Sequence, residues 1–512
     1  MIQKKKAYVL SADSTFTLNK DVTLENIKFE GAFKLTITSE SGKHFALTVN
    51  YDFGTKTGAE AGTIFQTSSL VIDNADVTVV QKDTGKTEGP KSNQAGSSVF
   101  GITDVEVKGK SILTVTTNEF ANRLFYNSSS EATELKITGS EAKVVLNSTT
   151  SSTAKLSMSD GAQLVVTNPI HTIGNFYPNI SNTGAQCRIT VTGAEGNHGL
   201  FFYGVQGIGS GTSSAAGTLK NVAVSSDGIV GFYGTASQDA IDATGSTVTA
   251  KKLAAVNTST GNIAKLSGAT LDVEEIAAPM TGWYTEATNT KTLELSGVVF
   301  IGDTVVTEKA VVVIAGETSS VVKSGTLKGA LVFGAEKASL KVEEKASFDG
   351  AVSFTQSEET SKAQVDVTAG KGGFTMAAGS IDFSGAVVEQ TANSIVIVSG
   401  VAKVSGEFTL PSGTTLTVKD GADMAIVENA TFTVANGATM TVEKSADVTN
   451  DTNAKFVNNG TVIVKGTVDK IDNKKTVRLY GKITGGNNDG TIVVMDKGAV
   501  VGNIAGTGSI DV

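Results

Sequence analysis

Between Gly413 and Asn458 the sequence repeats every eight residues, and this period constrains the fold more than any other feature. Gly, Asn or Ser opens each unit, and Ala occurs just after it in most units. A large apolar residue follows, and through Val442 a Val or Ile stands two residues later. Side chains at i and i+2 lie on one face of a strand, and Gly, Asn and Ser suit turns. Each unit is therefore predicted to be a short strand followed by a corner.

The composition favours an all-β protein. The chain has 512 residues, of which 40% are hydrophobic and only 18% are charged, with 56 Gly and 5 Pro. Thr and Val are frequent, and they suit a pleated, half-buried surface, whereas Gly suits tight corners. A chain of this length can form several ordinary domains or one long repeat array.

The corners distinguish two all-β architectures. In an antiparallel meander successive turns lie at opposite ends of the sheet, so turn chemistry would alternate with a period of about sixteen residues. Here the corners from Gly413 to Asn453 have nearly the same composition. Each octad is therefore predicted to be one side of a coil in a parallel β-solenoid, with about 16 residues per coil for two sides or about 24 for three, and about 4.8 Å between stacked strands. Tandem antiparallel β-sandwich (Ig-like) domains are the alternative, because they also show turns every 8–12 residues or so.

The octad register also predicts the core. Inward-facing residues of stacked strands should form a continuous apolar core column. The residues assigned to this column are Leu416, Met424, Phe432, Met440, Val448 and Phe456.

The strand pattern changes along the chain and suggests three regions. A polar stretch at 82–97 is predicted to be a loop that leaves the array, and the pattern blurs between about 168 and 212. The segment Ala335–Ala346 also fits one face of a helix. We predict a strand, because Leu340 and Val342 alternate with polar residues. The predicted regions are an N-terminal β-solenoid at 1–167, a less regular β region at 168–300 and a regular octad β-solenoid at 301–512.

Two segments carry a family resemblance. The segment Asp21–Gly31 places an Asn between two short strands, and Leu70–Val79 is a second copy of this pattern. This strand–Asn–strand pattern resembles the rungs of right-handed parallel β-helices such as the pectate lyase-like proteins. The repeat style of most of the chain resembles the repeat passenger regions of bacterial and archaeal adhesins, and surface-layer or sheath-like proteins. The resemblance implies a parallel β-helix exposed at a prokaryotic cell surface, and it includes no catalytic motif.

Charge, cysteine count and hydropathy exclude several classes of partner. A net charge of −9 argues against a nucleic-acid partner, because phosphate binding needs a basic face. One cysteine, Cys187, excludes an intramolecular disulfide framework. No run approaches the 18 or so apolar residues of a membrane span, so no transmembrane segment is expected. The apolar run within Met1–Ser11 is too short for the core of a signal peptide. We therefore expect an extracellular protein whose sequence is given in its mature or recombinant form.

The sequence predicts no catalytic, cofactor-binding or metal-binding residue, and we expect a protein that is not an enzyme. His171 and His198 have no Asp or Cys at ligand spacing, and a loop excursion with a small hydrophobic cluster is the preferred interpretation of that region. The aspartates that alternate with apolar residues are interpreted as a solvated strand face: Asp73, Asp76, Asp349, Asp366 and Asp382.

Two alternative functions remain at this point. A carbohydrate-active β-helix enzyme of the lyase or hydrolase type would require acidic residues and an Arg to converge near 170–285, where Trp283 and Tyr284 lie. An adhesin would contact a surface glycan or a host protein through the loops at 82–97 and 168–212.

The two ends of the pattern suggest self-association. Strand-like alternation begins by Phe16–Ile37, and the last residues, 509–512, again read as a strand. Open strand edges can add a strand from another molecule, and a head-to-tail contact of this kind does not close. We therefore expect a structural protein of the cell surface that assembles into a filament, sheath or surface layer. The residues predicted to take part are Phe16, Leu18, Ile510 and Val512.

Overall fold

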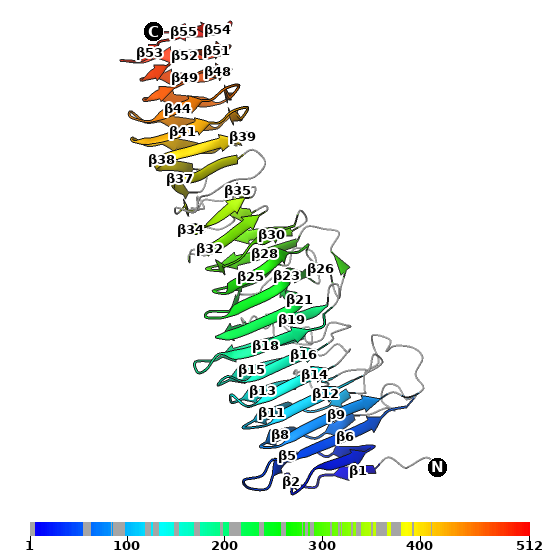
Figure 1. Cartoon of the computed structure of the whole chain (residues 1–512). Coiled ribbons are helices and arrows are strands. Elements are labelled where there is room, and N and C mark those ends of the chain that lie inside the picture. The colour runs from blue at the N-terminus through cyan, green and yellow to red at the C-terminus, as the bar shows by residue number, and fades with distance from the viewer. Residues whose placement is uncertain are drawn as a thin grey trace. The chain divides into compact units, whose positions relative to one another are not determined.

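All secondary-structure elements that the computed structural model describes are β-strands, stacked like rungs (Figure 1). The chain divides into two compact units, Met1–Leu293 and Glu294–Val512, with the boundary inside β28 (Lys291–Ser296). The described residues are 6–54, 63–82, 84, 98–117, 124–125, 133–147, 153–167, 175–194, 198–203, 217–234, 240–257, 263–278, 280–281, 285–286, 291–307, 310–315, 318, 320–328, 331–333, 339–349, 352–354, 366–369, 380–391, 394–410 and 412–512.

The first unit begins as a coil with three sides, each a parallel sheet. The first sheet contains β1 (Lys6–Val9), β4 (Ile27–Glu30), β7 (Thr63–Gln66) and β10 (Ser98–Phe100). The second contains β2 (Ser14–Leu18), β5 (Lys34–Ser39), β8 (Ser69–Asp73), β11 (Asp104–Lys108), β13 (Thr133–Thr138) and β15 (Thr153–Ser159). The third contains β3 (Val22–Glu25), β6 (Ala46–Asp52), β9 (Asp76–Lys82), β12 (Ile112–Thr116), β14 (Lys143–Asn147), β16 (Gln163–Thr167) and β18 (Cys187–Thr192).

The later part of the first unit is less regular but still mainly parallel. There β17 pairs with β15, and its two ends then pair with β19 and β20 respectively. The pairing of β21 with β23 shifts register between Ser226 and Ile229. The remaining strands of this unit are β17 (Asn175–Ser181), β19 (Gly199–Tyr203), β20 (Thr218–Lys220), β21 (Val222–Gly234), β22 (Ile241–Asp242), β23 (Thr247–Asn257), β24 (Ile263–Ser267), β25 (Thr270–Ile276), β26 (Met280–Thr281) and β27 (Thr285–Glu286).

The second unit starts with parallel strand pairs, and one antiparallel pair follows them. Parallel pairing connects β29 (Val299–Phe300), β30 (Thr304–Val306), β31 (Ala310–Ile314), β32 (Ser320–Lys328), β33 (Leu331–Phe333), β34 (Ser339–Asp349), β35 (Val352–Phe354) and β36 (Asp366–Ala369). An antiparallel pair follows, formed by β37 (Ser380–Thr391) and β38 (Ser394–Ser405).

Beyond β38 the octads form a second three-sided coil. One side contains β40 (Thr415–Val418), β43 (Thr439–Val442), β46 (Thr461–Val464), β49 (Thr476–Leu479), β52 (Thr491–Val494) and β55 (Ser509–Asp511). The next contains β41 (Ala422–Ile426), β44 (Asp447–Asn450), β47 (Thr467–Val468), β50 (Lys482–Ile483) and β53 (Ala499–Val500). The third contains β39 (Glu407–Leu410), β42 (Thr431–Val434), β45 (Lys455–Asn458), β48 (Ile471–Asn473), β51 (Gly486–Asn488) and β54 (Ile504–Ala505).

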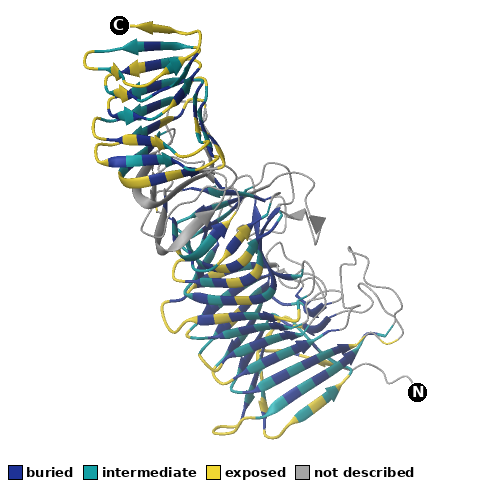
Figure 2. Ribbon diagram, turned by 45° about the horizontal axis from the view of Figure 1, so that its top comes forward, coloured by how far each residue is buried: buried dark blue, intermediate teal, exposed yellow. Residues whose placement is uncertain are grey.

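The predicted parallel β-solenoid is therefore confirmed. Among the pairings given for the described strands, only β26–β27 and β37–β38 are antiparallel, so the alternative of tandem antiparallel sandwiches is wrong. Buried and more exposed residues alternate along the strands (Figure 2), as expected when one face of each strand lines the coil. The segment Ser339–Asp349 is a strand, as preferred from the sequence. The division into three regions at 167 and 300 stays a prediction.

The predicted core column is three columns rather than one. All six residues assigned to it are buried, but stacking joins every third octad: Leu416 with Met440, Met424 with Val448, and Phe432 with Phe456. One octad of the sequence is one side of the coil, and the spatial period in this region is three octads, from Thr415 to its partner Thr439.

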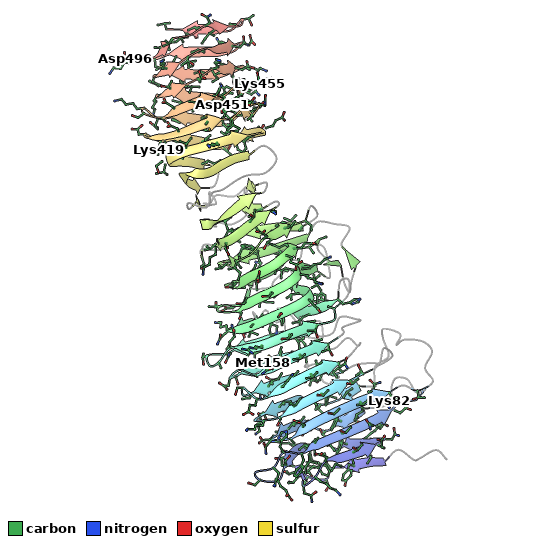
Figure 3. The ribbon with its side chains drawn as sticks, in the orientation of Figure 1. Lys82, Met158, Lys419, Asp451, Lys455 and Asp496 are labelled. Atoms are coloured by element: carbon green, nitrogen blue, oxygen red, sulfur yellow. The ribbon has the colours of Figure 1, made fainter. Side chains whose placement is uncertain are left out.

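The corners between octads share one turn. In each, the backbone N–H of the Ala donates to the carbonyl three residues earlier, for example Ala430 to Val427 at 3.0 Å and Ala438 to Ala435 at 2.9 Å. The residue before the Ala has a positive φ in most corners: Gly421 (79°), Asn429 (61°), Gly437 (82°) and Asn453 (58°), with Ser445 the exception. Gly and Asn adopt this left-handed conformation more easily than other residues. Charged residues lie at such corners on the outside, as Lys419 and Asp496 show (Figure 3).

The same conformation explains the strand–Asn–strand segments of the first unit. Asn26 (φ 55°) lies between β3 and β4, and Asn74 (φ 56°) lies between β8 and β9. Each Asn therefore turns the chain from one side of the coil to the next.

The coil becomes shorter toward the end of the second unit. Thr415 stacks on Thr439, three octads later, whereas Thr461 stacks on Thr476 and Thr476 on Thr491, less than two octads later in each case. Shorter corners use Gly because they approach the preceding corner closely: a Cβ at Gly481 would lie 2.1 Å from the carbonyl oxygen of Gly466.

Buried asparagines replace apolar residues where the coil shortens. Asn458 Nδ2 donates to Asn473 Oδ1 at 2.8 Å, and Asn473 Nδ2 donates to Asn488 Oδ1 at 2.7 Å. Each amide also donates to a backbone carbonyl of the following coil, those of Thr476, Thr491 and Ser509. All three side chains are almost fully buried, so this asparagine ladder satisfies its polar groups inside the coil.

A stack of aromatic rings fills the first coils of the first unit. The ring centroids of Tyr8, Phe29, Phe65, Phe100 and Phe125 are separated by 6.0, 5.0, 5.4 and 5.5 Å in that order. Offset-stacked rings at such distances stabilise each other beyond the apolar area that they bury.

We expect Asn473→Ala to lower the local stability of the last coils by about 2–4 kcal/mol, because it leaves the buried amides of Asn458 and Asn488 without their mutual partner. Hydrogen exchange of β45–β52 would measure the loss of protection. Asn436→Ala, at an exposed corner, is the control and should change stability by less than about 0.5 kcal/mol. Equal effects of the two variants would contradict the structural role of the ladder.

We expect Gly481→Ala to cost about 2–4 kcal/mol, since the added methyl group meets backbone atoms that cannot move without separating two coils. Gly421→Ala is the matched comparison, because its Cβ meets nothing within 4 Å and only its positive φ opposes the change, at about 1 kcal/mol. Hydrogen exchange of the strands that flank each site would measure the loss of stability in both variants. A smaller effect at Gly481 than at Gly421 would show that close coil contact is not the reason for glycine.

Candidate functional site

Open strand edges are the first candidate site. Strands β1, β2 and β3 pair with β4, β5 and β6, and β53, β54 and β55 pair with β50, β51 and β52. No strand of the described part of the chain pairs with the other edge of these six strands. Alternate N–H and C=O groups of an edge strand point away from the sheet and can bind a further strand.

The residues predicted to self-associate differ in their positions. Leu18 points into the coil and is 1% exposed, so it can contribute only its backbone to a contact. Phe16 is half-buried and meets the Tyr8 ring edge-on at 6.4 Å. Ile510 is 47% exposed and Val512 is fully exposed. Their role in self-association stays a prediction.

Other apolar side chains are exposed at the same edges, and the sequence analysis missed them. Tyr8 is 53% exposed and Val9 72% exposed beside β2, and Val501 is 62% exposed next to β53. Tyr8 is the outer ring of the aromatic stack, so one ring face is covered by Phe29. Only the coil geometry, which places these residues at an edge, distinguishes them from interior apolar residues.

The aspartates connect coils rather than form an acidic site. Asp76 Oδ1 accepts a hydrogen bond from the backbone N–H of Ile112 at 3.1 Å and lies 2.9 Å from His44 Nε2. Asp73 pairs with Lys108 at 3.5 Å. Four other aspartates also accept a hydrogen bond from a backbone N–H of the next coil: Asp13, Asp21, Asp303 and Asp423. The side chains of Asp349, Asp366 and Asp382 lie outside the described residues.

The irregular middle of the first unit contains a small hydrophobic cluster, but β17, β18 and β19 are paired strands of the coil, so the loop excursion predicted for this region is wrong at their residues. Phe201 belongs to a cluster of buried residues, and the adjacent Phe202 packs against the Phe232 ring at 5.8 Å. Both Phe side chains are therefore buried, one on each face of β19. The other members of the cluster are Ile229, Tyr233, Ala254, Val256 and Ala277.

The described polar residues of this region include no group that could hold a metal ion. Burial raises the pKa of the Cys187 thiol, which lies inside the coil, and burial also raises the pKa of Tyr177 on β17. Arg188 is exposed on β18. Among the described residues no three His, Cys, Asp or Glu side chains are close enough to hold a metal ion. His171, Trp283, Tyr284 and nearly all of the loop at 82–97 lie outside the described residues.

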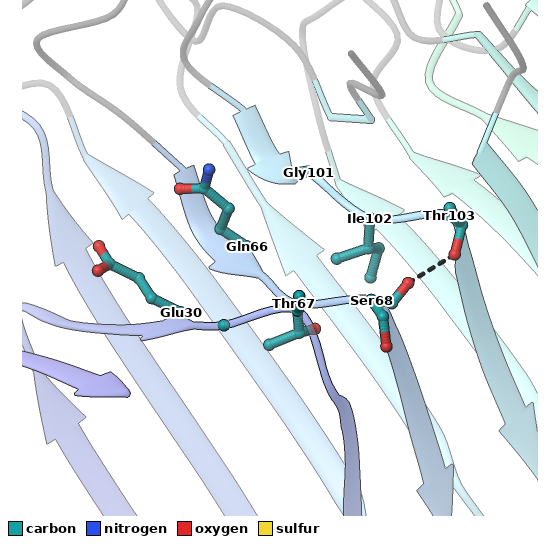
Figure 4. A pocket seen from close by; sticks show the side chains of 9 residues that line it. Glu30, Gln66, Thr67, Ser68, Gly101, Ile102 and Thr103 are labelled. Atoms are coloured by element: carbon teal, nitrogen blue, oxygen red, sulfur yellow. Dashed lines mark hydrogen bonds between the residues drawn. The ribbon is translucent and has the colours of Figure 1, made fainter. Parts of the chain in front are cut away.

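A shallow groove crosses the corners between the first and second sheets of the first unit (Figure 4). Three successive coils each contribute a corner, and the groove has a volume of about 460 Å³. Backbone hydrogen bonds hold the corners together, from Gly31 N to Gln66 O at 3.0 Å and from Gly101 N to Phe65 O at 2.8 Å. The lining residues are Glu30, Gly31, Ala32, Gln66, Thr67, Ser68, Gly101, Ile102 and Thr103.

Comparisons with known proteins add little to this geometry. No protein-family model and no curated protein matches this sequence. One solved structure, a TibC-catalysed hyper-glycosylated TibA fragment, aligns with 98% of this chain and 97% of its own at 9% identity and a TM-score of 0.12. A score this low does not indicate a shared arrangement. No helix among the described residues is long and apolar enough to cross a membrane.

Burial, and to a smaller extent the negative charge of Glu30, raise the pKa of Tyr51 to about 12. An ordinary tyrosine ionises near pH 10. Because the folded protein favours the neutral phenol, the contribution of Tyr51 to stability is complete below about pH 10 and is lost as the pH rises toward 12.

We therefore expect Tyr51→Phe to remove one late step, near pH 12, from the absorbance titration of the folded protein at 295 nm. Glu30→Gln should move this step to lower pH, since it removes the nearby negative charge. If Tyr51→Phe instead removes a step near pH 10, the result would contradict the burial of this phenol.

Proposed function

We propose that this chain is a non-enzymatic structural protein of the prokaryotic cell surface that assembles head to tail through its open strand edges. The edges of β1–β3 and β53–β55 support this proposal, because each presents three parallel strands in the order of the coil. A strand that adds to such an edge continues the existing hydrogen-bond pattern. A contact between two different edges does not close, so it produces filaments or layers.

The sizes of the two terminal coils are similar enough for stacking. The first coil runs from Phe16 to its stacked partner Ile37, and the last runs from Ile492 to Ile510, so both are between two and three octads long. The strands at the C-terminal edge are short, with two residues in β53 and β54 and three in β55. Few hydrogen bonds can therefore form per contact, and we expect assembly to depend strongly on protein concentration.

Assembly of the 512-residue chain can be measured by light scattering and electron microscopy over a concentration series. Wild type should form filaments or layers, and Ile510→Lys with Val512→Lys should raise the critical concentration at least about tenfold, because charged side chains at an edge oppose strand addition. Val305→Lys changes an exposed residue of β30, which is not one of the edge strands, and this control should assemble like wild type.

Monodisperse wild-type particles at every concentration would contradict the proposal. Unchanged assembly of the Ile510→Lys, Val512→Lys variant would contradict the role of the C-terminal edge, and loss of assembly in the Val305→Lys control would point to side-by-side contacts instead.

A further inference from the structure

The groove at the stacked corners of the first unit has polar groups that the fold does not use. Glu30 and Gln66 are direct partners in the pairing of β4 with β7, so their side chains lie next to each other on adjacent strands. Both project at the same end of the groove (Figure 4). Within the described part of the chain, neither side chain has a hydrogen-bond partner. The carboxylate offers acceptors, and the amide offers two donors and one acceptor.

Hydroxyl groups line the other end of the groove. Thr103 Oγ1 donates to the carbonyl of Ser68 at 2.6 Å, lies 3.1 Å from Asp104 Oδ2, and can still accept hydrogen bonds. The Ser68 hydroxyl lies beside it and has no partner among the described residues (Figure 4). The two ends of the groove therefore present complementary donors and acceptors to one small polar molecule.

The floor between these ends consists of Ile102 and Thr67. Ile102 is 2% exposed, and the buried Thr67 uses its hydroxyl to donate to the carbonyl of Ser69 at 3.2 Å. The floor therefore exposes little surface of its own, and the polar groups at the two ends suit a ring that has hydroxyls around its edge. The volume of about 460 Å³ is sufficient for one such ring.

Charge restricts the ligand further. Glu30 is the only charged residue among the nine that line the groove. A carboxylate-bearing ligand would be repelled by it, and an amine-bearing ligand would gain an ion pair.

We infer that this groove binds a single sugar unit, neutral or amine-bearing, with Glu30 and Gln66 at one edge of the ring and Ser68 and Thr103 at the other. This binding does not depend on the proposed assembly. No aromatic side chain lines the groove, so the Kd should be on the order of millimolar, or about −4 kcal/mol.

The inference can be tested by ligand-observed NMR on the full chain with glucosamine, glucose, glucuronate and ethylamine. Glucosamine should bind about two- to fivefold more tightly than glucose, the range of a partly exposed ion pair. Glucuronate should bind more weakly than either sugar. Ethylamine should not compete, because it lacks the ring hydroxyls that the polar groups at the two ends of the groove bind.

Variants assign the binding to this groove. Glu30→Gln should remove the preference for glucosamine over glucose, and Gln66→Ala should weaken both. Glu274→Gln changes an exposed carboxylate of the same unit on β25 and should have no effect. Circular dichroism of each variant would show that the fold is intact.

Three results would overturn the inference. They are no binding of glucose or glucosamine at tens of millimolar, binding of ethylamine as tight as that of glucosamine, and wild-type affinity in both the Glu30→Gln and the Gln66→Ala variants.

Discussion

The parallel hydrogen-bond ladder between successive coils is the constraint on which the rest of the structure depends. Each strand's backbone groups find their partners about one coil away in sequence, so side chains at equivalent positions stack in register. The aromatic stack that begins at Tyr8 and the asparagine ladder at Asn458 are both results of this register. Asp76 and Asp423 follow the same rule, since each accepts a hydrogen bond from a backbone N–H of the next coil. The coil thus makes columns of like residues favourable, whether they are aromatic, aliphatic or amide.

Much of the local structure could be predicted from the sequence. Alternation of apolar and polar residues located the strands, and Gly or Asn before Ala located the corners, because both depend on neighbouring residues only. The number of sides per coil could not be predicted, because identical octads look alike whether two or three of them complete a coil. For this reason Leu416 and Met424 were assigned to one column but lie on different sides.

The shortening of the coil did have a signal in the sequence. Asn458, Asn473 and Asn488 recur at one constant spacing, and Gly460, Gly466 and Gly481 replace the longer octad corners. The groove had no such signal. Glu30 and Gln66 lie far apart in the sequence, and the segments between corners vary in length in this part of the chain, so only the pairing of β4 with β7 brings them together. Sites of this kind depend on tertiary stacking and escape any argument from local pattern.

The change from three octads per coil to less than two has a consequence for the interior. A smaller cross-section leaves less room for large rings, and Phe456 is the last phenylalanine of the sequence; beyond it the lumen is filled by Val, Ile, Leu and amide side chains. Since the short coils are bounded by similar glycine corners and carry the same amide, one such module could be duplicated or deleted as a whole. Each event would change the height of the stack by a single step of about 4.8 Å and leave the neighbouring modules unaltered.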